Sequence, residues 1–412
     1  MEKSASKEAL GIQPQIPNAS GSAWKNVRGV LQKNAMLIVL GLVYIFFLIT
    51  TNGNIFKPMH MNLIIKENAY VYILGCGMLM CMLTGGNIDL SCGAFVCLLG
   101  SIGGYLLVNL NLSSWVTILL MLGVAILDGC LLGYLIAYVH IPPWIVTLAG
   151  YLSFRGLGTQ LLTVASPKTN AIKIPKSNPF LDIFSGTIFK TSPREVNWVC
   201  AITGFVLAAV VVASMFIIRQ RRIRKGYSVG SLVSTIVKSV LSAAAIVVIM
   251  WQLAHDGGIP TVLLWVVGIV LIYGFITGRT TIGRRFYVVG GNREAARMSG
   301  VNTKRIMFMA YLNMAFLTAL ATMTVMSRLQ AANSQMGTNF EMDAIAACVV
   351  GGVSASGGAG TIFGMVIGAT LIGVINHGMP MIGVNIDIQK VVKGLVLLGA
   401  VVFDIISKKR SR

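Results

Sequence analysis

The sequence contains little charge, and acidic residues are especially few. Only 11% of its 412 residues are charged, and 13 Asp and Glu stand against 33 Lys and Arg, while 55% of the residues are hydrophobic. The mean hydropathy is +0.78. A soluble domain of this length would need far more polar surface. Apolar runs of about 20 residues are instead what a hydrocarbon layer roughly 30 Å thick demands. The composition therefore excludes a soluble protein and indicates an integral membrane protein.

The patterns that mark common enzymes and metal sites are also missing. The chain has no G-x-x-x-x-G-K-[ST] phosphate loop and no Gly-x-Ser-x-Gly elbow. Its seven cysteines form no Cys-x-x-Cys pair, and its four histidines are scattered without ligand spacing. We therefore expect no metal site, no directly bound cofactor and no ATP hydrolysis by this chain itself.

The apolar runs are continuous and do not alternate with a period of two, which favours helices over a barrel. The predicted fold is all-α, a polytopic bundle of about twelve transmembrane segments. The expected domains are a polar N-terminal tail (1–35), a transmembrane domain (36–406) and a basic tail (407–412). The expected spans are 36–56, 67–84, 90–108, 115–139, 143–163, 196–218, 231–254, 261–278, 306–330, 343–360, 361–379 and 389–406.

The net charge of +20 raises the question of nucleic-acid binding, and the positions of the basic residues answer it. If the N-terminus is cytoplasmic, most Lys and Arg fall in the two tails, in "RQRRIRK" (219–225) and in the loop 279–305. The outer loops then hold fewer. This is the positive-inside asymmetry, so we expect a multi-pass protein of the cell (inner) membrane with both termini cytoplasmic and no nucleic-acid partner.

Two glycine-rich stretches interrupt the apolar runs. "GGNIDLSCG" (85–93) and "GGVSASGGAG" (351–360) each lie between segments of about span length. Glycine permits turns and close approach, while hydroxyl and carboxylate groups can satisfy the backbone amides that a broken helix leaves open. We predict two broken-helix hairpins. Residues predicted to line a translocation path or to form these turns are Asn87, Asp89, Ser91, Asp343, Ser354, Ser356 and Asn376.

Asp89 is the most unusual of these residues because a carboxylate within a span costs at least about 2.5 to 3.5 kcal/mol. Three roles are open. The carboxylate could cap the helix expected to start near Leu90, line a solute path, or join an interhelical salt bridge. Candidate basic partners near or inside spans are Arg155, Lys238, Arg328, Lys390 and Lys393.

The loop 279–305 contains "NREAARMSGVN", which predicts a short amphipathic helix opened by Asn292 and closed by Gly300. Such a helix between two spans suits docking of a soluble partner, although a basic loop on the membrane surface is the other interpretation. The predicted coupling residues are Asn292, Arg293, Glu294, Ala295, Ala296, Arg297 and Gly300.

Several long motifs in one order carry a resemblance. "GGNIDLSCG", "VVGGNREAARMSGVNTKR", "EMDAIAACVVGGVSASGGAGTIFGMVIGATLIGVINHGM" and "QKVVKGLVLL" together strongly resemble permease subunits of the bacterial ribose, xylose and multiple-monosaccharide ABC importers, over about 36–406. The xylose and multiple-monosaccharide permeases are the most similar. They share an extra apolar hairpin that 196–254 matches.

The resemblance implies a permease that moves a monosaccharide such as xylose, galactose or glucose. It implies a homodimer, a separate ABC ATPase that uses ATP and Mg, and an extracytoplasmic sugar-binding protein that selects the sugar. The competing interpretations are an ion-coupled secondary transporter, an importer of a nucleoside or other non-sugar cargo, and a membrane receptor or scaffold. Large soluble domains, which a receptor would require, are not apparent in the sequence.

Overall fold

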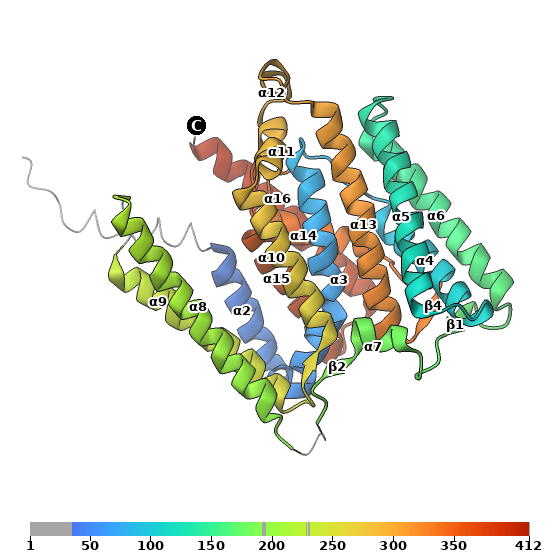
Figure 1. Ribbon diagram of the computed structural model, residues 1–412, viewed down its shortest axis with the longest axis horizontal. Helices are drawn as coiled ribbons and strands as arrows, with labels where there is room; N and C mark the ends of the chain where they lie inside the picture. The colour runs from blue at the N-terminus through green and yellow to red at the C-terminus, as the bar shows by residue number, and fades with distance from the viewer. Residues whose placement is uncertain (1–34, 192–194, 228, 230, 412) are drawn as a thin grey trace, which may run out of the picture.

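The computed structural model describes residues 35–191, 195–227, 229 and 231–411, and side chains as far as residue 402. The predicted all-α membrane bundle is confirmed (Figure 1). Its α-helices are α2 Ala35–Thr50, α3 Pro58–Leu83, α4 Cys92–Gly104, α5 Ser114–Ala137, α6 Pro143–Ala165, α7 Pro179–Ser185, α8 Trp198–Arg224, α9 Leu232–Ala254, α10 Thr261–Arg279, α11 Thr281–Gly291, α12 Arg293–Met298, α13 Thr303–Leu329, α14 Phe340–Val350, α15 Ile362–Met381 and α16 Ile386–Ser411.

Short strands lie at one end of the bundle. β1 (Ala171–Lys173) pairs antiparallel with β4 (Ala331–Asn333), and β2 (Thr187–Ile188) pairs antiparallel with β3 (Ile259–Pro260). We call this the strand end, and we call the opposite end, where α12 projects, the α12 end (Figure 1). The two ends give the bundle a direction that the sites below can be placed on.

Long apolar helices form the body of the bundle. Among the described residues, eight helices are long and apolar enough to cross a membrane: α3, α4 with its π-helical extension to Asn109, α5, α8, α9, α10, α13 and α15. α2 is apolar but shorter, with 16 residues. α3 and α13 lie in the centre, where α3 packs against α10, α13, α14 and α15. Each contributes more side chains to the main buried core than any other helix.

The expected transmembrane span 343–360 is wrong. α14 ends at Val350 after 11 residues, and the chain then turns at Gly351 and Gly352. The glycines and serines that follow leave too few helix-forming residues to continue. α14 is therefore a short buried helix, not a crossing.

The hairpin α8–α9 stands apart from the other helices. Its helices pack on each other, and its contact with the bundle is at the strand end, where the Gln252 side chain donates to the carbonyl of Phe56 (2.8 Å) and Asn62 donates to Asp256 (2.5 Å). Figure 1 shows both helices leaning away from the bundle toward the α12 end. Most of their apolar side chains are exposed, which suits a surface that faces lipid.

The N-terminal tail (1–34) lies outside the described residues. At the other end, α16 continues as a helix to Ser411, so the basic segment 407–411 extends this helix.

Candidate functional site: two glycine breaks and a coupling helix

The two glycine-rich breaks meet at the α12 end of the bundle. Gly86, at φ +74°, lies so close to the second break that a Cβ there would be 2.1 Å from the carbonyl oxygen of Ala355. Gly357, at φ +86°, would place a Cβ 2.5 Å from the Cα of Gly85. The amide of Gly358 donates to the carbonyl of Leu83 (3.2 Å). Only glycine fits both the positive φ and this backbone contact.

Helix α11 joins the same contact. A Cβ on Gly290 would lie 1.7 Å from the carbonyl oxygen of Leu83 and 2.6 Å from the amide nitrogen of Gly358. The Tyr287 hydroxyl donates to the carbonyl of Gly360 (2.8 Å). α11 therefore touches the last residue of α3, just before the first break, and the second break itself, so three segments distant in sequence meet at one point.

α12 follows α11 and has the ends that the sequence predicts. Asn292 caps it, accepting from the amide of Ala295 (2.9 Å), and Gly300 turns the chain at φ +78°. Ala296 is fully buried, whereas Met298 is 80% exposed at the end of the helix. The sequence did not predict α11, because its apolar and polar residues alternate irregularly.

Two charged residues of α12 form a surface pair. Glu294 and Arg297 lie 3.1 Å apart with about 70% of each side chain exposed, a geometry worth about 0–1 kcal/mol. Arg293 and Ala295 are also exposed. α12 thus presents a small knob with charged sides and an apolar tip.

Asp89 closes a local turn and forms no salt bridge with any residue that the structure describes. Its carboxylate accepts from the amide (2.8 Å) and the hydroxyl (2.6 Å) of Ser91, and the residue is 3% exposed. Helix α4 begins at Cys92 rather than near Leu90. The carboxylate thus orders the turn before the helix, close to the predicted cap. Asn87 also bonds locally, donating to the Thr84 hydroxyl (3.0 Å).

The second break contains its own hydroxyl pair. Ser354 and Ser356 lie with their hydroxyl oxygens 2.9 Å apart, and the Ser354 hydroxyl accepts from the amide of Ser356 (3.2 Å). These contacts hold the turn between α14 and α15.

Asp343 and Asn376 come together in a buried polar group. Asn376 donates to the Asp343 carboxylate (3.2 Å), as does the Tyr70 hydroxyl (2.6 Å), and Lys393 of α16 forms an ion pair with it (3.0 Å). Asp343 is 2% exposed. Removing Lys393 would leave a buried charge held by neutral donors alone.

A cavity of about 250 Å³ lies beside this ion pair. It separates α14 from α16 and is lined by Asn339, Met342, Asp343, Ala346, Lys390, Lys393, Gly394 and Leu397. Both helices contribute polar and apolar residues to the lining, which is the mixture that binds small polar ligands.

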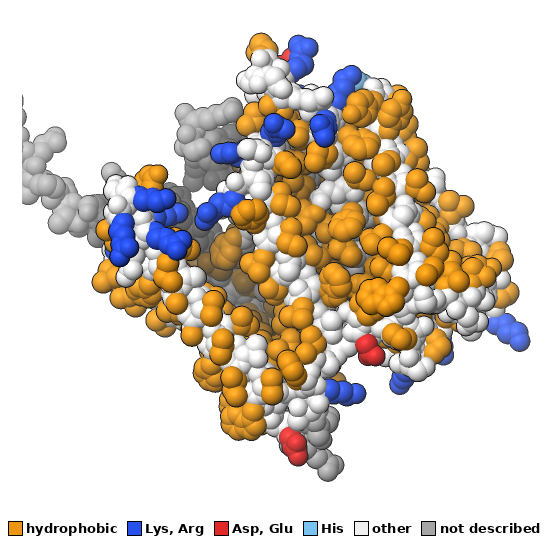
Figure 2. Space-filling view, viewed as in Figure 1, with side chains coloured by type: hydrophobic (Ala, Val, Ile, Leu, Met, Phe, Trp, Pro, Cys, Tyr) orange, Lys and Arg blue, Asp and Glu red, His pale blue; other side chains and the backbone are white. Residues whose placement is uncertain are grey.

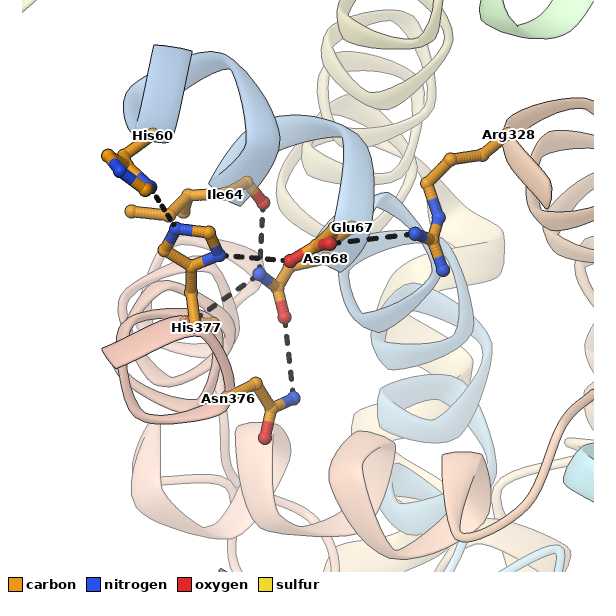
Figure 3. Close-up of polar contacts among 8 residues, drawn as sticks. His60, Ile64, Glu67, Asn68, Arg328, Asn376 and His377 are labelled. Atoms are coloured by element: carbon orange, nitrogen blue, oxygen red, sulfur yellow. Dashed lines mark hydrogen bonds and ion pairs between the residues drawn. The ribbon is translucent and has the colours of Figure 1, made fainter. Parts of the chain in front are cut away.

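A second polar chain continues toward the strand end (Figure 3). His60 contacts His377 (3.1 Å), His377 contacts Glu67 (3.0 Å), and Arg328 of α13 lies 3.6 Å from Glu67. Asn68 belongs to the first group, because its side-chain oxygen accepts from Asn376 (3.3 Å). The two groups are neighbours, since Glu67 and Asn68 are adjacent in α3 and Asn376 and His377 are adjacent in α15.

The structure distributes the predicted site residues over separate places. Asp343 and Asn376 lie together, Asp89 and Ser91 lie together in the first break, and the serine pair lies in the second. Of the candidate basic partners, Arg328 and Lys393 form bridges with Glu67 and Asp343, and Lys390 pairs with Asp387 on the surface. Arg155 instead donates to the carbonyls of Ser334 and Met336.

Sequence reasoning missed Tyr70, Asn68, Glu67 and His377. Glu67 and His377 could have been singled out from the sequence, because ionisable residues inside apolar spans usually have a function or a partner.

Comparison with known proteins gives the family. The family described as "Branched-chain amino acid transport system / permease component" matches residues 61–401. Xylose transport system permease protein XylH of Escherichia coli is 33% identical over 97% of this chain and 98% of its own length. Ribose import permease protein RbsC of Bacillus subtilis is 31% identical over 91% of this chain and 94% of its own. No solved structure matches the chain. By this match over most of its length, the chain belongs to the family of transport-system permease components.

Proposed function

We propose that the chain is the membrane-spanning permease subunit of an ABC importer that moves a monosaccharide from an external binding protein to the cytoplasm. The names of the xylose and ribose permeases support the cargo class. ATP and Mg would be used by a separate ATPase subunit, with no cofactor on this chain.

The observation that carries the proposal is the contact of α11 with the end of α3, which leads into the first break, and with the second break. A soluble ATPase docked on α12 would push on α11, and α11 touches the turns that end α3 and start α15 through Leu83, Gly358 and Gly360. Backbone contacts without intervening side chains transmit small displacements, because close-packed segments have little room to deform. The docking segment is Asn292 to Gly300.

The polar set around Asp343 is the proposed solute path. Sugar hydroxyls would exchange hydrogen bonds with Asp343 and Lys393, which line the cavity, while Tyr70 and Asn376 hold the Asp343 carboxylate. A permease needs weak binding there, because tight binding would slow release. Asn87, Asp89, Ser91, Ser354 and Ser356 would maintain the turns rather than contact the solute.

The distribution of basic residues supports the orientation. "RQRRIRK" and the segment 279–305 lie at the α12 end, so this end would face the cytoplasm with both termini. The strand end would then receive the external binding protein. A second copy of the chain would complete the pore as a homodimer.

Pull-down of the tagged full-length chain from its native membrane tests the docking. Recovery of an ATPase with nucleotide-binding motifs, together with a sugar-binding protein, is expected. The variant Met298→Asp should recover less ATPase, because a charge replaces the apolar tip of α12. Met59→Asp is the matched control, since Met59 is 61% exposed at the other end of the bundle and should recover the normal amount.

Either of two results would contradict the proposal. Equal ATPase recovery by the unmodified chain, the Met298→Asp variant and the Met59→Asp variant would show that α12 is not part of the docking surface. Repeated recovery of the unmodified chain alone, under conditions that preserve a known importer complex, would favour a stand-alone secondary transporter.

A further inference from the structure

A strongly basic cavity lies between the hairpin α8–α9 and α10, at the α12 end. Its volume is about 630 Å³. The described residues that line it are Ile218, Arg221, Arg222, Lys225, Tyr227 and Arg279. Figure 2 shows basic side chains gathered at this end of the hairpin.

Four of the six lining residues are cations, and they come from two elements. Arg221, Arg222 and Lys225 belong to the end of α8, and Arg279 is the last residue of α10. Among the described residues, none of the four forms an ion pair. Each helix end favours its own cations through the helix dipole, but the dipole gives no reason for four cations to face one space. Mutual repulsion there would be relieved by an anion.

The surfaces next to the cavity are apolar and belong to helices long and apolar enough to cross a membrane. In the most apolar stretch of each helix, only 17% of α8 and 6% of α9 is buried. The hairpin is attached to the bundle at the strand end and leans away from it toward the α12 end (Figure 1). An anion held at the cavity that also has an apolar body would cover these surfaces.

We propose that the cavity binds the headgroup of an anionic phospholipid. The guanidinium groups of Arg221, Arg222 and Arg279 suit the oxygens of a phosphate, because their donors form a planar fork, and Lys225 adds a point charge. The acyl chains lie along the exposed apolar faces of α8 and α9. The lipid joins the hairpin to α10 at the end where direct protein contacts are few.

The test uses the purified full-length chain in detergent, with its lipid removed. Native mass spectrometry with added phosphatidylglycerol or phosphatidylcholine counts bound lipid, and a thermal unfolding series measures the stabilisation. The pocket variant is Arg221→Gln, Arg222→Gln and Lys225→Gln combined. The matched control is Arg224→Gln, Lys304→Gln and Arg305→Gln combined.

The control removes the same number of exposed cations from the same end, at positions that do not line the cavity. Phosphatidylglycerol should bind the unmodified chain and the control alike and should raise their unfolding temperature. It should bind the pocket variant about tenfold or more weakly, since each charge-assisted hydrogen bond to the phosphate that is lost weakens binding by roughly tenfold or more. Phosphatidylcholine should bind weakly to all three proteins.

Three results would overturn the proposal. Equal weakening in the pocket variant and the control would mean that general charge, not this cavity, attracts the lipid. Equal binding of phosphatidylcholine and phosphatidylglycerol would show that the cavity does not recognise an anionic headgroup. Stabilisation by inorganic phosphate equal to that by phosphatidylglycerol, abolished in the pocket variant, would mean that a free anion occupies the cavity rather than a lipid.

Discussion

Replacing Gly290 by alanine should uncouple ATP hydrolysis from uptake. The new Cβ would lie 1.7 Å from the Leu83 carbonyl oxygen, and real contacts do not fall below 3.0 Å. Both atoms on the receiving side, the Leu83 oxygen and the Gly358 amide, are backbone, so no side chain can rotate away. α11 would therefore have to move away from the end of α3 and from the second glycine break.

The size of the effect follows from two comparisons. Overpacking of a close contact costs about 1–3 kcal/mol. Coupling free energies between linked sites are also about 1–3 kcal/mol, or roughly 5- to 150-fold in an equilibrium constant. A change of this size at the contact should therefore lower uptake per ATP hydrolysed by about fivefold or more, while the helices remain inserted.

Gly291→Ala is the matched control, because a Cβ on Gly291 meets nothing within 4 Å. This substitution should be neutral or slightly stabilising, by up to about 1 kcal/mol. The assay measures ATP hydrolysis and sugar uptake together in vesicles that hold the complete importer, at equal abundance of each variant. Equal coupling ratios for Gly290→Ala and Gly291→Ala would refute the mechanical role of this contact.

The ion pair and the first turn give two further predictions. Lys393→Met should lower thermal stability by about 1–3 kcal/mol and reduce uptake, because Asp343 is buried and would keep only neutral donors. Its control, Lys390→Met, removes an exposed ion pair and should lower the stability by less than about 1 kcal/mol. Asp89→Asn should retain near-normal stability and uptake, since an amide oxygen still accepts from the Ser91 amide. Asp89→Ala should lose about 1–2 kcal/mol in thermal unfolding.

Each of these has an outcome that contradicts it. Indistinguishable unfolding temperatures for Lys393→Met and Lys390→Met would show that the buried pair contributes no more than the exposed one. Normal insertion but lost uptake in the Asp89→Asn protein would give the Asp89 charge a direct role in the path.

Local features of the coupling segment could be predicted from the sequence. Asn292 is a good N-cap and Gly300 is a good helix terminator, and both effects act within one turn of the chain. The structure confirms both ends of α12. The two glycine breaks were predictable from composition, because glycine and serine are poor helix formers, although the cluster Gly100, Ser101, Gly103 and Gly104 lies inside α4.

Contacts between distant segments could not be predicted in this way. The residues around Gly86, Gly290 and Gly357 do not predict that these glycines meet. Each glycine permits a close approach of another segment, but the sequence does not show which segment that is. The shortness of α14 was missed because the expected span 343–360 ran on through the glycine-rich stretch 351–360, where the backbone turns. The pairing of Glu67 with His377 joins residues 310 positions apart.

Sugar uptake into proteoliposomes tests directly whether the chain is the permease subunit of an ATP-driven importer. The chain would be reconstituted with the ATPase and the binding protein that co-purify with it, and labelled monosaccharide would be followed with ATP on the ATPase side and no ion gradient. The account predicts uptake that requires ATP, the ATPase and the binding protein together. Uptake by the chain alone, driven by an ion gradient and indifferent to ATP, would contradict it.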